Sequence, residues 1–164
     1  MTVRDIRLFG DPVLKTVTDP VTVFDRALRV LVEDLLETTD MDGRAGVAAT
    51  QIGSTKRVFA WHIDGETGYV VNPELVATGG ELIEDGPEGC LSVPGLSFPT
   101  PRWSRATVHG VDVDNEPVEI SGEGLMARML QHETDHLDGL LYLDRLRPDT
   151  RRTALRAVRR SDWF

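Results

Sequence analysis

Two histidines four residues apart, His132 and His136, restrict the fold of this chain more than any other feature of its sequence. They enclose Glu133 in an HExxH pattern, and residues i and i+4 lie on the same face of an α-helix. Both imidazoles can therefore bind one metal ion. Glu133, about 100° around the helix, can approach a water on that ion without being a ligand. Hydrolytic metal sites commonly have three protein ligands, so the pattern predicts a helix here and a third ligand elsewhere.

The residues before the histidines extend this predicted helix. Leu125 and Met129 precede His132 and His136 at spacings that place all four side chains on one stripe. Histidines in an apolar stripe would lack partners in a core unless something binds them, which favours a metal over the alternative of a solvated polar face. Gly139 stands where a C-terminal helix cap is expected.

The rest of the sequence predicts a mixture of helices and strands. Residues 24–40 place leucines and valines at helical spacing, Gly43 and Gly46 should then open a loop, and a last helix should follow Pro148. Strands are expected where β-branched and aromatic residues lie between turn residues. These segments are 57–63, 69–72, parts of 81–97, 106–113 and 117–120. We expect one α+β domain over residues 1–164, with mostly antiparallel sheets around a central HExxH helix and with N-terminal and C-terminal helices.

Composition narrows the possible partners. The formal net charge of −9 argues against a DNA-binding protein, because phosphate contacts need a basic surface. No apolar run approaches the roughly 20 residues that span a membrane. The first residues lack the apolar stretch of a secretory signal, so we expect a cytoplasmic protein. Arginines nevertheless concentrate in residues 151–160.

The third metal ligand has several candidates. No histidine follows His136, and the downstream carboxylates Asp144, Asp149 and Asp162 stand in no recognisable ligand motif. Cys90 is the one cysteine, so it forms no intramolecular disulfide. It is either a buried apolar side chain or a reactive or metal-binding thiolate.

Three separated motifs resemble those of the peptide deformylases, which remove the formyl group from the N-terminal methionine of new bacterial polypeptides. Residues 46–51 resemble the family loop GxGxAAxQ, residues 88–92 resemble its EGCLS, and residues 132–139 resemble its HExDHLxG. Residues 10–14 are also similar to the family, and the likeness covers essentially the whole chain. It implies a metal-dependent hydrolase that acts on the N-formylmethionyl peptides of nascent chains and releases formate.

The resemblance also implies a role for individual residues. Glu133 would be the general acid and base. The backbone N–H of Leu91 and the side-chain amide of Gln51 would face the developing oxyanion. Gly46 and Gly89 would offer backbone hydrogen bonds to an extended peptide. The implied metal ligands are Cys90, His132 and His136.

One thiolate with two imidazoles accepts Fe²⁺, Co²⁺, Ni²⁺ or Zn²⁺. Among these ions, the resemblance favours Fe²⁺ in cells. Iron beside a thiolate predicts an oxygen-sensitive site, because both the metal and the sulfur can be oxidised.

Residues near the motifs are candidates for binding or bracing roles. Leu125 and Met129 would form the apolar wall that receives the methionine side chain, with plain core packing as the alternative. Arg128, one helical turn before the first histidine, should line the mouth of the pocket. Three charged residues either orient the ligands or form ordinary surface ion pairs. These are Glu88, Arg102 and Asp135.

Two positions depart from the family pattern. Arg44 stands where the loop has its first glycine, and Gly95 stands where many members have glutamate. Neither removes a ligand, so both bear on substrate preference and rate. The alternatives are a low-activity accessory relative, a zincin-type metallopeptidase that cuts internal bonds, and a closed metal site, which would need a fourth ligand. The arginines of residues 151–160 either belong to a solvated terminal helix, where late cations complement the helix dipole, or contact the ribosome.

Overall fold

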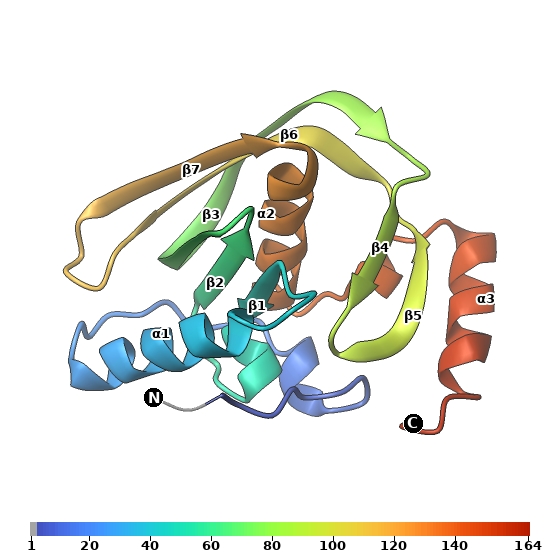
Figure 1. The fold of residues 1–164 in the computed structure, drawn as a ribbon, viewed down its shortest axis with the longest axis horizontal. Helices are drawn as coiled ribbons and strands as arrows, with labels where there is room; N and C mark the ends of the chain where they lie inside the picture. The colour runs from blue at the N-terminus through green and yellow to red at the C-terminus, as the bar shows by residue number, and fades with distance from the viewer. Residues whose placement is uncertain (1–2) are drawn as a thin grey trace.

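The fold is organised around one buried helix, α2 (Gly124–Leu137), which lies against a five-stranded antiparallel sheet (Figure 1). The computed structural model describes residues 3–164. The strands of the sheet, in spatial order, are β1 (Gly46–Ala48), β2 (Val58–Ile63), β3 (Glu66–Ile83), β6 (Arg102–Val111) and β7 (Pro117–Glu123). β4 (Pro87–Cys90) and β5 (Val93–Pro99) form a two-stranded sheet of their own. The remaining helices are α1 (Arg26–Thr39), α3 (Pro148–Val158) and the 3₁₀ turns η1 (Pro12–Lys15), η2 (Ala49–Ile52) and η3 (Tyr142–Asp144).

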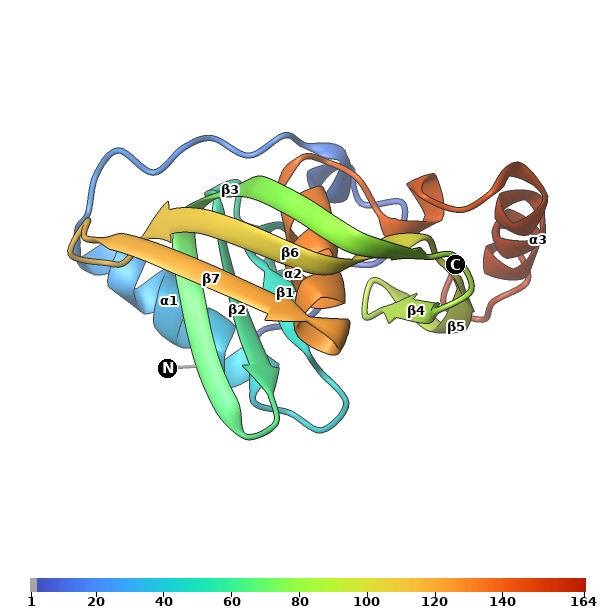
Figure 2. The same ribbon diagram turned by 90° about the horizontal axis from the view of Figure 1, so that it is seen from above.

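The long strand β3 bends the sheet around α2. Its first residues pair with β2 and its later residues pair with β6, and three shifts in register interrupt the second pairing. Such shifts bend a strand. At the first shift Asn72 has a left-handed φ of +52°, and its side chain accepts from the N–H of Val21 (2.7 Å) and donates to the carbonyl of Val21 (2.9 Å). The bend carries β3, β6 and β7 across α2, as seen from above in Figure 2.

The sheet separates two apolar cores because alternate residues of a strand point to opposite faces. On one face Phe59 packs with Leu130 of α2, and on the other face Ala60 packs with Leu35 of α1. α1 begins where the carboxylate of Asp25 accepts a hydrogen bond from the N–H of Leu28 (3.1 Å), a typical N-cap. α2 therefore covers one face of the sheet at β2, and α1 covers the other face.

The β4–β5 hairpin packs against α3 instead of joining the large sheet. Val93 of β5 is buried in a third apolar cluster with Leu146, Ala154 and Val158. Figure 1 shows the hairpin between α2 and α3. Within residues 3–164, no strand ladder joins the hairpin to the large sheet, so the position of Cys90 depends on the other contacts that the hairpin makes.

The structure confirms the α+β class, the helix predicted over 24–40, the HExxH helix and the helix that begins at Pro148. The strand predicted over 69–72 is only part of β3, whose distal half is mostly exposed and is interrupted by two consecutive glycines, Gly79 and Gly80. The loop predicted at Gly46 is wrong, since residues 46–48 form β1 and pair with β2. Among the described residues, no helix is long and apolar enough to cross a membrane.

Gly139 caps α2 as predicted, with a φ of +74°, and its replacement tests how tightly the helix end is packed. Gly139→Ala should lower the free energy of unfolding more than Gly65→Ala. Both positions have left-handed φ, so each alanine costs about 1–2 kcal/mol in backbone strain. A Cβ on Gly139 would also lie 2.7 Å from the carbonyl oxygen of Lys15, whereas a Cβ on Gly65 meets nothing within 4 Å. Urea unfolding of both variants in the same metal state measures the difference, and equal losses would contradict the packing argument.

Candidate active site

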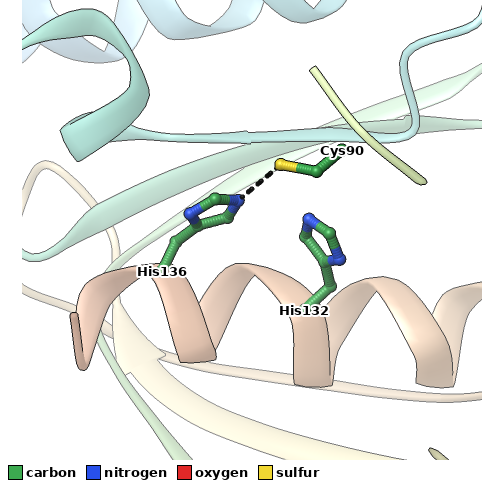
Figure 3. A group of neighbouring side chains, drawn as sticks. All are labelled: Cys90, His132 and His136. Atoms are coloured by element: carbon green, nitrogen blue, oxygen red, sulfur yellow. Dashed lines mark hydrogen bonds between the residues drawn. The ribbon is translucent and has the colours of Figure 1, made fainter. Parts of the chain in front are cut away.

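Two elements bring the three predicted metal ligands together. His132 and His136 project from one face of α2, and Cys90, the last residue of β4, lies opposite them (Figure 3). The Sγ atom of Cys90 is 3.3 Å from Nε2 of His136. One potential ligand atom from each residue lies within 4.8 Å of the others, and residues 3–164 add no fourth member to this group.

This arrangement fits a divalent metal ion. Around a tetrahedral ion with bonds of about 2.3 Å to sulfur and about 2.0–2.1 Å to nitrogen, ligand atoms are about 3.3–3.6 Å apart. A sulfur–nitrogen pair lies at the upper end of this range, and the 3.3 Å between Sγ of Cys90 and Nε2 of His136 is within about 0.3 Å of it. Thiolate and imidazole suit the later first-row divalent ions, and three protein ligands leave one position open, as in catalytic sites.

Glu88 orients the first histidine. Its Oε1 is 2.7 Å from Nδ1 of His132, and because an ionised carboxylate only accepts, Nδ1 carries a proton, which leaves Nε2 as the nitrogen that can bind a metal. Burial opposes the charge of Glu88, but hydrogen bonds from His132 and Arg102 hold the pKa of Glu88 below its usual range. Burial lowers the pKa of His136, which keeps that imidazole neutral and able to bind a metal.

Glu88 also belongs to a buried network of charges. Arg102 of β6 donates to both carboxylate oxygens of Glu88 (2.7 and 3.1 Å) and to Asp135 of α2 (2.6 Å). Arg128 donates to Glu88 (2.8 Å) and to the carbonyl of Thr100 (2.9 Å). The side chains of Glu88 and Arg102 are each 4% exposed, so the surface-ion-pair alternative is wrong for them. The network ties β4, which carries the thiol, to the helix that carries the imidazoles.

Glu133 has a buried carboxyl group with unused hydrogen-bonding capacity. The residue is 3% exposed, and its Oε2 has no hydrogen-bond partner among the described residues. Burial raises the pKa of Glu133 to about 7. The carboxyl group of Glu133 can lie this close to β1 only because residue 46 is glycine. A Cβ at that position would lie 2.6 Å from Oε1 of Glu133. A carboxyl group that titrates near neutrality beside a metal site is suited to proton transfer in both directions.

Gln51 places its amide nitrogen beside the thiol. Its Oε1 accepts from the backbone N–H of Ala48 (2.9 Å), which directs Nε2 toward the Sγ of Cys90 (3.6 Å) and the Oγ of Ser92 (3.3 Å). The contact with Ser92 is long for an N–H···O bond. The amide therefore keeps donor capacity on the side where the ligands meet.

A cavity of about 550 Å³ opens onto these groups. Every residue that the sequence predicted for the site lines it, except the buried His136. Met129 is 3% exposed and also belongs to the apolar core, whereas Leu125 is 55% exposed and lies at the rim instead of on an inner wall. Glu88 and three other residues discussed above also line the cavity. The three are Arg44, Gly95 and Arg128.

Two contributors to the site were missed in the sequence. Ser92 contacts Gln51 and is fully buried, and its place in the EGCLS motif could have drawn attention to it. Arg145 donates two hydrogen bonds to Asp135 (2.6 and 3.0 Å) from beyond α2. No local pattern marks Arg145, because its partner is defined only by the tertiary fold.

The arginine-rich segment has one apolar face and one basic face. Ala154 and Val158 of α3 are buried against the hairpin. Two of the arginines form ion pairs with nearby aspartates, Asp144 and Asp149. The exposed arginines are Arg151, Arg152, Arg156, Arg159 and Arg160.

Comparison with known proteins identifies the family. The model of the family "Polypeptide deformylase" matches residues 3–152. A peptide deformylase of Acidothermus cellulolyticus is 53% identical over 163 residues, which covers 99% of this chain and 89% of the relative. Peptide deformylase 1 of Corynebacterium efficiens is 46% identical over 168 residues, which covers 100% of this chain and 99% of the relative. A crystal structure of a peptide deformylase from Legionella pneumophila has a TM-score of 0.88 at 39% identity, covering 96% of this chain and 94% of that chain. As the motifs predicted, this chain belongs to the polypeptide deformylase family.

Proposed function

We propose that this protein hydrolyses the formamide bond of N-terminal formyl-methionine on newly made polypeptides and releases formate. The observation that carries this function is a group of three potential metal ligands, two of which line a cavity together with Glu133. Family membership indicates the same reaction. Newly made chains are the substrates, so we place the reaction in the cytoplasm.

We assign residues 1–164 to one catalytic domain. Site residues come from elements between β1 and α2, and α3 packs against β5 next to them. A division of the chain between these elements would separate groups that share one cavity.

Cys90, His132 and His136 would hold the ion, and we propose Fe²⁺ in cells, with Zn²⁺, Ni²⁺ or Co²⁺ as possible substitutes. A bound divalent cation supplies Lewis acidity, which lowers the pKa of a water molecule and polarises the formyl carbonyl. Oxidation of the thiolate would remove one ligand, so oxygen should inactivate the iron form.

Glu133 holds and moves the proton in this mechanism. Its carboxylate accepts a proton from the attacking water and returns it to the amine nitrogen as the C–N bond breaks. A pKa of about 7 for Glu133 suits both transfers at neutral pH. Packing against Gly46 restricts the positions that the carboxyl group can take.

Two donors are assigned to the oxygen of the formyl group. Attack on the carbonyl carbon places negative charge on this oxygen, and Nε2 of Gln51 and the N–H of Leu91 would donate to it. A preorganised donor of this kind stabilises a transition state by about 2.7–4 kcal/mol. Ala48 holds the Gln51 amide in place before substrate arrives.

The peptide part of the substrate would bind along the cavity walls. Gly46 and Gly89 would pair with its backbone as an added strand does. Met129 would contact the methionine side chain from inside, and Leu125 would contact it from the rim.

Protein prepared without oxygen should release formate from formyl-Met-Ala-Ser. Gln51→Ala should lower kcat about 10²–10³-fold, the usual cost of one oxyanion donor. Glu133→Gln should lower kcat further, because it removes the acid and base altogether. Formate release and metal content are measured on the same samples. Loss of metal in step with loss of activity would contradict these role assignments, and absence of formate from metal-loaded wild type would overturn the function.

Gly46→Ala should lower kcat by about 10²-fold while the metal is retained, because the new Cβ displaces the carboxyl group of Glu133. Gly89→Ala is the matched comparison. A Cβ at Gly89 would lie 3.2 Å from the carbonyl oxygen of Leu96 and 4.0 Å from the Cβ of Ser97, and it would not meet Glu133, so the effect of Gly89→Ala should fall on KM. Steady-state kinetics separate the two outcomes, and a purely KM effect of Gly46→Ala would contradict the prediction.

We further propose that the exposed arginines of α3 and of the turn that follows it contact the ribosome. Deleting the helix would be a poor test, because Ala154 and Val158 support the hairpin. The double variant Arg156→Glu, Arg160→Glu should instead weaken co-sedimentation with ribosomes. Wild-type co-sedimentation should also fall when salt is raised from about 50 to about 200 mM, because the contact is electrostatic. Formate release from a short peptide should stay the same. Ribosome binding that is unchanged by the substitutions and by salt would exclude this contact.

A further inference from the structure

The outer wall of the cavity is the segment 91–97, which joins β4 to β5 and forms most of β5. Five of its residues line the cavity. Pairing between the strands jumps from Cys90 opposite Val93 to Gly89 opposite Ser97, so residues 94–96 bulge out of the ladder. The position of the bulge must therefore be set by contacts from outside the hairpin.

Three carbonyl groups at alternate positions of the wall accept hydrogen bonds from distant parts of the chain. The carbonyl of Ser92 accepts from the N–H of Phe9 (2.8 Å), that of Pro94 accepts from the Nε1–H of Trp163 (3.0 Å), and that of Leu96 accepts from the O–H of Tyr142 (3.4 Å). The second of these bonds is formed by a side chain that follows α3. The indole of Trp163 packs in the apolar cluster of α3 and does not line the cavity.

The bond from Trp163 acts on the peptide group between Pro94 and Gly95. Gly95 has a φ of +73°, and glycine tolerates both signs of φ, so this peptide plane could rotate. A trans peptide holds its C=O and N–H in opposite directions. With the carbonyl of Pro94 fixed on the indole, the N–H of Gly95 points away from Trp163, and Gly95 itself lines the cavity.

We propose that Trp163 is a positioning residue that turns the N–H of Gly95 toward the substrate. This donor binds a backbone carbonyl of the peptide beyond the formyl-methionine. The inference rests on the proposed function, and it adds a residue that acts from outside the cavity. It also assigns Gly95 a role as a backbone donor, for which no side chain is needed.

Two substrates and two tryptophan variants test this role. In Trp163→Phe, which keeps an aromatic ring and loses the N–H, KM for formyl-Met-Ala-Ser should rise about three- to tenfold, the cost of one hydrogen bond, with kcat little changed. KM for formyl-methionine amide, which lacks the later carbonyls, should stay the same. The control is Trp103→Phe, because Trp103 is exposed on β6 and belongs neither to the lining of the cavity nor to the apolar cluster that holds Trp163.

Gly95→Ala reaches the same peptide group by another route. A Cβ at Gly95 has nothing within 4 Å, so only the left-handed φ is disfavoured, and the variant should share the selective rise in KM. In zinc-loaded protein labelled with ¹⁵N, the Gly95 amide signal should broaden or shift in Trp163→Phe and not in Trp103→Phe. This measurement does not depend on activity, so it tests the inference even if wild type released no formate.

Three results would overturn the inference. One is an unchanged KM together with an unchanged Gly95 signal in Trp163→Phe. Another is an equal rise in KM for the long and short substrates, which would indicate a general structural effect. The third is the same effect in Trp103→Phe.

Discussion

Glu88 accepts hydrogen bonds from His132, Arg102 and Arg128, and through them its buried carboxylate connects a hairpin, the large sheet and the central helix. A buried carboxylate costs free energy unless donors surround it, so these partners have to be in place together. Once they are, the proton of His132 is assigned to one nitrogen and the thiol of Cys90 is brought to the helix face. The orientation of the ligands thus depends on an anion that is not itself a ligand.

The histidine pair and its helix could be predicted because helical periodicity is local. Cys90 could be recognised from its motif, but its distance to His136 could not, because that distance depends on how the hairpin packs. The full length of β3 was missed since its exposed half lacks apolar alternation. Leu125 has the right helical spacing, yet α2 begins only one residue before it, which leaves its side chain exposed at the rim.

Glycines allow two kinds of close approach in this site. At Gly46 the missing side chain lets the carboxyl group of Glu133 lie against β1, so a strand and a helix can share a catalytic group. At Gly95 the backbone adopts a conformation that other residues disfavour. The sequence assigned Gly46 to a substrate contact and Gly95 to a departure from the family pattern. The structure adds a steric reason for glycine at the first position and a conformational reason at the second.

The separation of the β4–β5 hairpin from the large sheet has a consequence for folding. An ion shared by Cys90 and His132 would close a loop of 42 residues, from 90 to 132, and such closure removes conformational freedom from the unfolded chain. The ion would then act as a cross-link between two parts of the protein that share no ladder of backbone hydrogen bonds. Metal binding and the docking of the hairpin would become one cooperative event.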